Sequence, residues 1–176
     1  MCGTDLALGL CRVSRCRVDD FALLLRALGN QRDHILATVD GLDDEQLTTS
    51  LVPSGWSPGG LVQHLALDVE RYWFRAVFAG QAVERAGDPA GSWDVAPGDG
   101  RAAIDRYREE CALADEVIAA HASSDEPLAW PDRWGSWRLA NLYQMALHVV
   151  TETACHAGHL DIVRETIDGT QNFVIG

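Results

Sequence analysis

Four stretches of the chain carry apolar residues at intervals of three and four, the spacing that places side chains on one face of an α-helix. These stretches cover residues 19–41, 57–80, 101–122 and 136–169. No series of alternating polar and apolar residues, of the kind typical of β-strands, accompanies them. The pattern predicts an all-α fold in which four long helices pack as a bundle around one core.

Several of the predicted helices begin or end at residues that are known to stabilise helix ends. An aspartate at position 19 or 20 can cap the first helix, and Ser136 can cap the fourth, because a short polar side chain accepts hydrogen bonds from unpaired N–H groups of the first turn. Ser57-Pro58 starts the second helix, since proline lacks the N–H that would be unpaired there. Gly169 is expected to end the last helix, because glycine is favoured just beyond a helix C-terminus.

The segments between the predicted helices are rich in proline, glycine and small polar residues. Residues 43–56 contain Pro53 and Gly55 and are expected to form a loop. Residues 81–99 are expected to form a long connection between helices two and three, and connections of this length are often functional. Residues 1–18 lack a clear period and are expected to be a poorly ordered or irregular leader, followed by one helical domain over residues 19–176.

The balance of charges narrows the range of partners. The 176 residues include 14 basic residues, all of them arginine, and 26 acidic residues, for a formal net charge of −12. Such a surface repels the phosphates of nucleic acids and anionic membranes, so neither is expected as a partner. No apolar run approaches the roughly 20 residues that cross a bilayer, and no two cysteines form a CxxC pair. We therefore expect a cytoplasmic protein with reduced thiols.

The fourth predicted helix carries a stripe of polar residues that could bind a metal ion. The stripe consists of His148, Glu152, His156 and His159, which lie at about 0, 40, 80 and 20 degrees around a helix. A glutamate and a histidine four residues apart can both reach one metal ion, and carboxylate with imidazole suits zinc, nickel, manganese or iron. His64, the only histidine of the second predicted helix, would supply a ligand from across the bundle.

Spacing alone leaves the choice of ligands on the fourth helix open. The neighbouring pairs 148 with 152 and 156 with 159 are placed about as well as the pair 152 with 156. The same side chains could also form an ordinary solvated face of a bundle helix. His34 and His121 are interpreted as hydrogen-bonded structural residues, the more common role of a single histidine.

Tryptophans and arginines near the same helices suggest two further hypotheses. The tryptophans at positions 56, 73, 93, 130, 134 and 137 could wall an apolar pocket, although packing in the core is their more common role. Arg71, Arg75 and Arg138 could pair with a substrate carboxylate through two parallel hydrogen bonds, if they are not simply solvated.

Two long motifs resemble a known superfamily. The second predicted helix contains PSGWSPGGLVQHLALDVERYWFRAVFAG, and the fourth contains HVVTETACHAGHLDIVRETIDG. Together these motifs resemble the DinB/YfiT-like metalloproteins, in particular their actinobacterial DinB-like branch. The resemblance extends from about Asp19 to Gln171. It implies a four-helix bundle of the DinB/YfiT-like type with a long connection between helices two and three.

The resemblance also implies a set of metal ligands. The superfamily usually has three histidines, one on helix two and two spaced by four on the last long helix, where a Gly-Gln follows the final ligand. Alignment of that ending with residues 156–159 implies His64, Glu152 and His156 as ligands. It puts His159 where the superfamily has glutamine. The glutamate makes the set similar to that of the mycothiol-dependent maleylpyruvate isomerases.

The function that the resemblance implies concerns a small thiol. Related proteins use one divalent metal ion, with zinc as the first choice, to activate a low-molecular-weight thiol such as mycothiol or bacillithiol. The activated thiol serves in S-transfer to an electrophilic substrate or in isomerisation, because the charge of the metal lowers the pKa of a bound thiol. His148, His159 and Asp68 would then lie beside the ligands or line the pocket.

Two other classes of function stay open at this point. One is a metal-dependent hydrolase in which the same site activates water. The other is a non-catalytic, metal-binding DinB-like protein of a stress response. Members of the superfamily are often homodimers, so a second copy of the chain is a further expected partner. Whether the chain is an enzyme, and on which substrate, does not follow from these residues.

Overall fold

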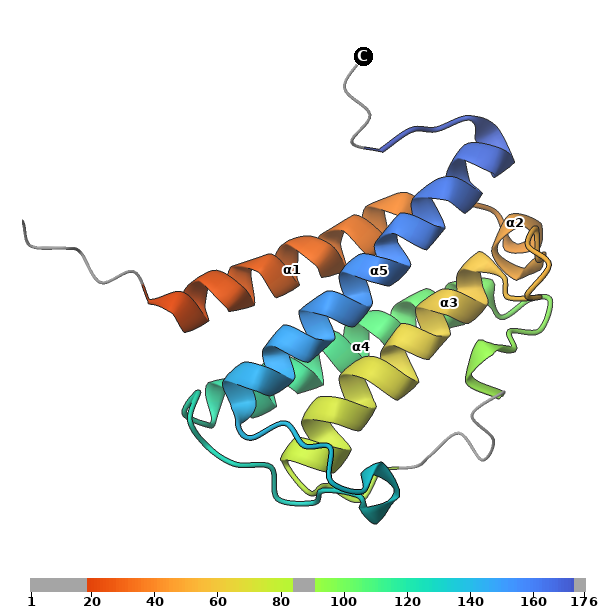
Figure 1. Ribbon diagram of the computed structural model, residues 1–176. Coiled ribbons are helices and arrows are strands. Elements are labelled where there is room, and N and C mark those ends of the chain that lie inside the picture. The colour runs from red at the N-terminus through yellow and green to blue at the C-terminus, as the bar shows by residue number, and fades with distance from the viewer. Residues whose placement is uncertain (1–18, 84–90, 173–176) are drawn as a thin grey trace, which may run out of the picture.

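The computed structural model describes residues 19–83 and 91–172, and every regular element within them is a helix (Figure 1). In chain order the elements are α1 (Asp20–Val39), α2 (Asp44–Thr48), α3 (Pro58–His64), the π-helix η1 (Leu65–Phe78), the 3₁₀ turn η2 (Gly91–Trp93), α4 (Gly100–Ala119), the 3₁₀ turn η3 (Asp132–Trp134) and α5 (Leu142–Asp168). The all-α prediction is confirmed for these residues. The leader predicted at residues 1–18 lies outside the described residues.

Three of the predicted helix ends are confirmed. Asp19 caps α1, since its side chain accepts hydrogen bonds from two backbone N–H groups of the first turn. Ser57 caps α3 by accepting a hydrogen bond from the Gly60 N–H at 3.1 Å, and Pro58 occupies the first helical position. Gly169 ends α5 in the left-handed conformation, with φ of 77°, which glycine adopts without a steric penalty.

The prediction of a loop over residues 43–56 is wrong in its first part, because α2 lies there. The Asp43 side chain accepts a hydrogen bond from the Gln46 N–H, and the Gln46 side chain accepts one from the Asp43 N–H, both at 2.9 Å. This reciprocal pair satisfies two N–H groups that a very short helix would otherwise leave unpaired. Leu47 is buried, and it anchors α2 to the core.

The prediction that Ser136 caps the last helix is also wrong. Helix α5 begins at Leu142, and Asn141 is its cap, with the side-chain oxygen accepting a hydrogen bond from the Gln144 N–H at 3.0 Å. The segment before this cap carries two tryptophans whose rings lie 5.9 Å from the ring of Trp73. This segment therefore packs against η1 and lies before the helix instead of forming its first turns.

Helix α3 continues into η1, where the hydrogen-bond pattern changes. Just beyond η1 the Ala79 N–H donates to the Phe74 carbonyl, five residues back, at 3.0 Å, whereas an α-helix pairs residues four apart. Most buried side chains of η1 recur at an interval of four, at positions 65, 69, 73 and 77 and at positions 66, 70, 74 and 78, and Tyr72 is buried as well.

Two close helix pairs build the core. Helix α1 lies against α5, and α4 lies against η1, while α3 contacts α4, η1 and α5 (Figure 1). The largest fully buried side chains come from all of these elements and include Leu28, Ile35, Leu61, Leu65, Phe74, Phe78, Ile104, Tyr107, Met145 and Leu160. One continuous apolar core therefore supports α3, η1 and α5, which carry most of the predicted site residues.

Buried ion pairs join η1 to its neighbours. Arg32 of α1 donates to both carboxylate oxygens of Glu70, at 2.8 and 2.6 Å. Glu110 of α4 accepts hydrogen bonds from both Arg71 and Arg75, at distances between 2.7 and 3.1 Å. Arg71 and Arg75 therefore hold Glu110, and the hypothesis that they receive a substrate carboxylate is not supported.

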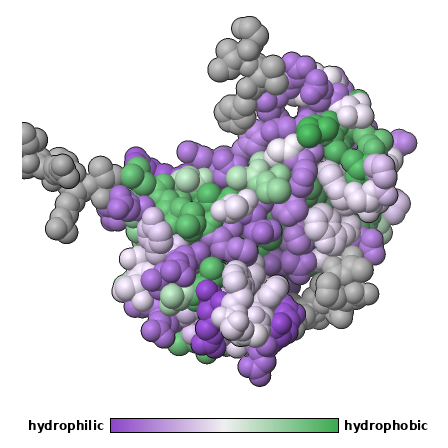
Figure 2. All heavy atoms as spheres, in the orientation of Figure 1, coloured by the Kyte–Doolittle hydropathy of each residue, from purple (hydrophilic) through white to green (hydrophobic). Residues whose placement is uncertain are grey.

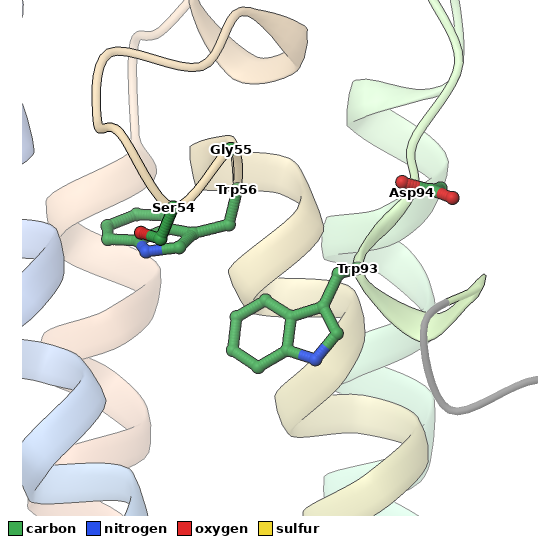
Figure 3. Close-up of a pocket in the computed structure, with 5 residues that line it drawn as sticks. All are labelled: Ser54, Gly55, Trp56, Trp93 and Asp94. Carbon is green, nitrogen blue, oxygen red and sulfur yellow. The ribbon is translucent and has the colours of Figure 1, made fainter.

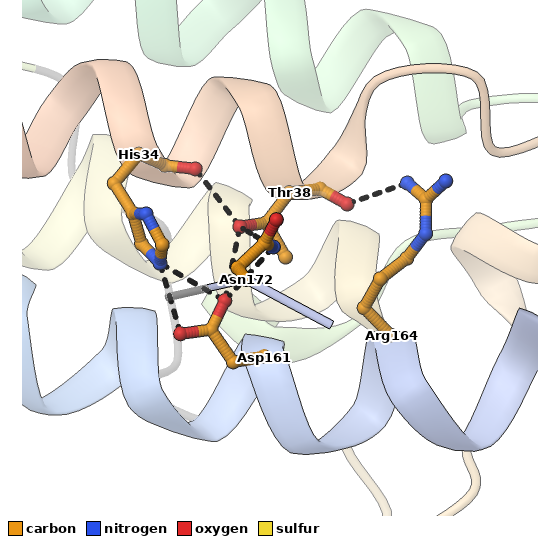
Figure 4. Close-up of polar contacts among 5 residues, drawn as sticks. All are labelled: His34, Thr38, Asp161, Arg164 and Asn172. Atoms are coloured by element: carbon orange, nitrogen blue, oxygen red, sulfur yellow. Dashed lines mark hydrogen bonds and ion pairs between the residues drawn. The ribbon is translucent and has the colours of Figure 1, made fainter. Parts of the chain in front are cut away.

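A cluster of polar contacts ties α1 to α5 near their common end (Figure 4). The His34 Nε2 lies 2.9 Å from each carboxylate oxygen of Asp161, and the Thr38 hydroxyl donates to the His34 carbonyl at 2.9 Å. Arg164 donates to the Thr38 carbonyl, and Asn172 donates to the Asp161 carboxylate. His34 thus has the structural role predicted for it, as part of the contact between two helices.

The surface is largely hydrophilic on the face drawn in Figure 2, with apolar residues gathered along α1 and α5 and near α2. The exposed large apolar side chains include Leu23 of α1 and Leu147 and Ile162 of α5. None of the helices in residues 19–83 and 91–172 is long and apolar enough to cross a membrane.

Candidate functional site

Two of the predicted ligands meet where α3 and α5 face each other. His64 is the last residue of α3, and His156 lies in the middle of α5. Their ring centroids are 5.1 Å apart with the rings nearly perpendicular, and each side chain is 15% exposed. The two imidazoles, 92 positions apart in the chain, therefore share one partly buried site next to solvent.

Asp68 fixes the orientation of the His64 ring. Its carboxylate lies 3.0 Å from His64 Nδ1, one turn further along the helix, and also accepts a hydrogen bond from the Ser92 hydroxyl. Burial acts against ionisation of Asp68, but the hydrogen bonds from His64 and Ser92 prevail and lower its pKa. A carboxylate at Nδ1 favours the tautomer that carries its proton there, which leaves the lone pair of Nε2 available.

Trp93 covers one face of His64. The two rings are stacked with centroids 3.9 Å apart, and Trp93 also lies edge-on to His156 at 5.8 Å. The Gln63 side chain holds this part of the chain by donating to the carbonyls of Ser92 and Asp94, at 3.3 and 2.9 Å. No local pattern in the sequence connects Trp93 with His64, because residues 81–99 show no periodicity.

A missing side chain makes the approach of Trp93 possible. A Cβ atom at Gly60 would overlap the carbonyl oxygen of Trp93. The second glycine of the Pro-Gly-Gly sequence is therefore required for the close contact between α3 and the chain at η2. The Pro-Gly-Gly-Leu motif, which contributed to the family resemblance, thus has a direct steric role beside the site.

Glu152 lies near the imidazole pair but does not complete a metal-binding group. Its carboxylate is 3.9 Å from His156 Nε2, and its side chain is 42% exposed. The His156 Nδ1 is buried without a hydrogen-bond partner. Within residues 19–83 and 91–172, no three histidine, cysteine, aspartate or glutamate side chains are arranged to hold a metal ion. The triad of His64, Glu152 and His156 stays a prediction.

Burial keeps His156 uncharged at neutral pH. It is the main cause that lowers the pKa of this residue to about 4, followed by the positive charge that His64 and His159 carry when protonated. A neutral imidazole with a free nitrogen can accept a hydrogen bond or bind a metal.

The remaining stripe residues lie on either side of His156. His148 packs edge-on against Trp73 at 4.7 Å, and burial lowers its pKa. His159 is exposed, at 5.6 Å from the His156 ring and 6.4 Å from that of Trp56. The stripe thus runs from the tryptophan cluster of residues 130–137 at one end to Trp56 at the other.

An open pocket of about 370 Å³ lies next to Trp93, the residue whose ring stacks on that of His64 (Figure 3). It is lined by Ser54, Gly55, Trp56, Trp93 and Asp94, contributed by the chain before α3 and by the chain at η2. Trp93 belongs both to the pocket and to the surroundings of His64 and His156.

Over residues 19–83 and 91–172, fold and site define a helical protein with a histidine pair that shares Trp93 with an open pocket. Comparison with known families is consistent with this class, since residues 23–169 match the mycothiol S-transferases. The chain belongs to this DinB-like family of mycothiol enzymes. No curated protein sequence matches the chain.

Proposed function

We propose that the protein is a metal-dependent mycothiol S-transferase in which His64, Glu152 and His156 hold one divalent metal ion, with zinc as the first choice. The observation that carries this proposal is the meeting of two imidazoles from separate helices at 5.1 Å. The family supports transfer of a thiol group, and the histidine pair supplies the ligands.

The donor atoms around the pair fit a metal ion. His64 contacts Asp68 through Nδ1, which leaves Nε2 for a metal, and a histidine that binds a metal commonly contacts a carboxylate in this way. His156 has a buried nitrogen without a partner. Because Glu152 is partly exposed, its carboxylate can turn toward the imidazoles without displacing a packed neighbour.

The proposed reaction exchanges one bond at the electrophilic carbon. A bound divalent metal would supply positive charge that lowers the pKa of the mycothiol thiol. The sulfur forms a bond to the electrophilic carbon, and the leaving group departs with the electron pair of the bond that breaks. We assign to His148, one turn before Glu152, the acceptance of the thiol proton, since imidazole is the most common proton acceptor near neutral pH.

Metal analysis combined with single substitutions tests the proposal. The purified protein should contain about one divalent ion per chain, and His64→Ala and His156→Ala should each weaken zinc binding at least about tenfold and abolish S-transfer. His121→Ala is the matched control, because its ring packs on Phe78 away from the site. Unchanged thiol transfer by the metal-free protein or by His64→Ala would contradict the proposal.

The same assay separates the two alternatives. Metal-dependent hydrolysis of an ester or amide without any thiol would identify a hydrolase that activates water. Stoichiometric metal without turnover on thiol, ester or amide substrates would identify a non-catalytic metal-binding protein. Isomerisation of a substrate in the presence of mycothiol would place the chain with the maleylpyruvate isomerases in function.

Three further expectations belong with the proposed function. The helices would form the DinB/YfiT-like bundle, and a thiol co-substrate fits the reducing cytoplasm.

The exposed Leu23, Leu147 and Ile162 fit a contact with a second copy of the chain. Sedimentation velocity would show a dimer, and charged substitutions at these positions would convert it to a monomer.

A further inference from the structure

We infer that the pocket between Trp56 and Trp93 binds the electrophilic substrate, and that this substrate is a neutral molecule with a planar aromatic ring. The inference rests on the proposed function, because it assigns the second substrate of the S-transfer. It concerns the five residues that line the pocket, none of which is among the proposed metal ligands.

The walls of the pocket favour a flat apolar group. Trp56 and Trp93 are two of the five lining residues, and both present large aromatic surfaces to it (Figure 3). An aromatic ring gains about 0.5 to 1.5 kcal/mol from contact with another ring beyond the burial of its area. The volume of about 370 Å³ lies in the range of pockets that bind small organic molecules.

The charges around the pocket disfavour an anion. Of the lining residues within 19–83 and 91–172, Asp94 is the only charged one, and none is basic. The nearby Arg106 donates to the Gln63 side chain, and Arg71 and Arg75 hold Glu110. A carboxylate on the ligand would have no arginine among these described lining residues to pair with, in a protein whose net charge is −12. A dicarboxylate such as maleylpyruvate is therefore a poor fit.

The position of the pocket suits a reaction with a thiol at the histidines. Trp93 lies 3.9 Å from the His64 ring and 5.8 Å from that of His156, measured between centroids. Trp56 lies 6.4 Å from the His159 ring. The pocket and the histidine pair therefore share Trp93 as a common neighbour, which places the proposed aromatic substrate on the side of the site where the thiol would be held.

Two unreactive probes of the same shape test the inference. Calorimetric titration of the full-length protein should show that 4-nitrobenzamide, which is neutral, binds at least about fivefold more tightly than 4-nitrobenzoate at pH 7. Trp56→Leu should weaken binding of the amide about tenfold. Trp134→Leu is the matched control, since this tryptophan is partly exposed but lies outside the pocket, and it should change the affinity less than about twofold.

Asp94→Asn keeps the test decisive if the tryptophan variant folds poorly. Asp94 is exposed, and only its backbone carbonyl is bonded to Gln63. This substitution should reduce the preference for the amide to less than about twofold. Equal binding of both probes to the wild type, or loss of binding in Trp134→Leu rather than Trp56→Leu, would overturn the inference.

The binding results are independent of the proposed function. Selective amide binding without any mycothiol transfer would leave the pocket assignment intact and refute the transferase. Mycothiol transfer together with equal binding of both probes would support the transferase and refute the pocket assignment.

Discussion

Removal of one partner of the buried ion pair between Arg32 and Glu70 is expected to destabilise the fold strongly. The Glu70 side chain is 0% exposed and that of Arg32 is 9% exposed, and two hydrogen bonds of 2.8 and 2.6 Å join them. Glu70→Gln keeps the volume but leaves the guanidinium charge buried. The loss in such cases is about 3 to 5 kcal/mol. Asp115 still contacts Arg32 at 2.6 Å, so we expect the lower end, about 3 kcal/mol.

Urea denaturation followed by circular dichroism, with a thiol reductant present, measures this loss. A matched control is Asp105→Asn, since Asp105 pairs with Arg108 on the surface, where the side chains are 63% and 49% exposed. The control should cost less than about 1 kcal/mol. Arg32→Met combined with Glu70→Leu should recover most of the stability, because neither charge then remains buried. If Glu70→Gln costs no more than Asp105→Asn, the reasoning about the buried charge is refuted.

Three further predictions concern the site and the end of α5. Gly60→Ala should displace the Trp93 carbonyl and destabilise the protein by about 1 to 3 kcal/mol, which thermal unfolding would detect; an unchanged midpoint would contradict the close contact. Asp68→Asn should weaken zinc binding by about 10- to 100-fold, whereas Asp161→Asn, in a histidine–carboxylate pair away from the site, should leave it unchanged. Hydrogen bonds from Arg164 and Thr170 lower the pKa of Asp168 to about 2. The ionised carboxylate therefore stabilises the fold fully above its ordinary pKa near 4, and this contribution is lost as the pH falls toward 2. In an Asp168→Asn variant the free energy of unfolding should fall less steeply with pH between about 4 and 2 than in the wild type, and equal slopes in the two proteins would refute this.

The helices were predictable where a local chemical signal marks them. The cap at Asp19, the start at Ser57-Pro58 and the stop at Gly169 each depend on residues adjacent in the chain. The missed helix α2 carried such a signal too, since Asp43 and Gln46 have the spacing of a capping box. The start of α5 is harder to predict because Ser136 and Asn141 are both good caps, and no residue adjacent to either one decides between them.

The π-helix and the site depend on contacts that no local pattern encodes. The buried positions of η1 give no local signal for a π-helix, because apolar rows spaced by four are also typical of α-helices. The meeting of His64 with His156 was expected from the bundle and the resemblance. The roles of Trp93 and Ser92 were not, since both lie in a segment without periodicity and reach His64 and Asp68 only through the fold.

The hydrogen bonds of Gln63 and Asp68, which precede and follow His64 in the chain, have a consequence for redesign of the pocket. Gln63 and Asp68 both form hydrogen bonds with residues 92–94. The His64 imidazole and this wall of the pocket are therefore held in a fixed position relative to each other. Ser54 and Asp94 line the pocket, and their side chains make none of these hydrogen bonds. A library of substitutions at these two positions should change which ligands bind while the imidazole keeps its orientation. The scaffold thereby separates the choice of ligand from the alignment of the reactive groups.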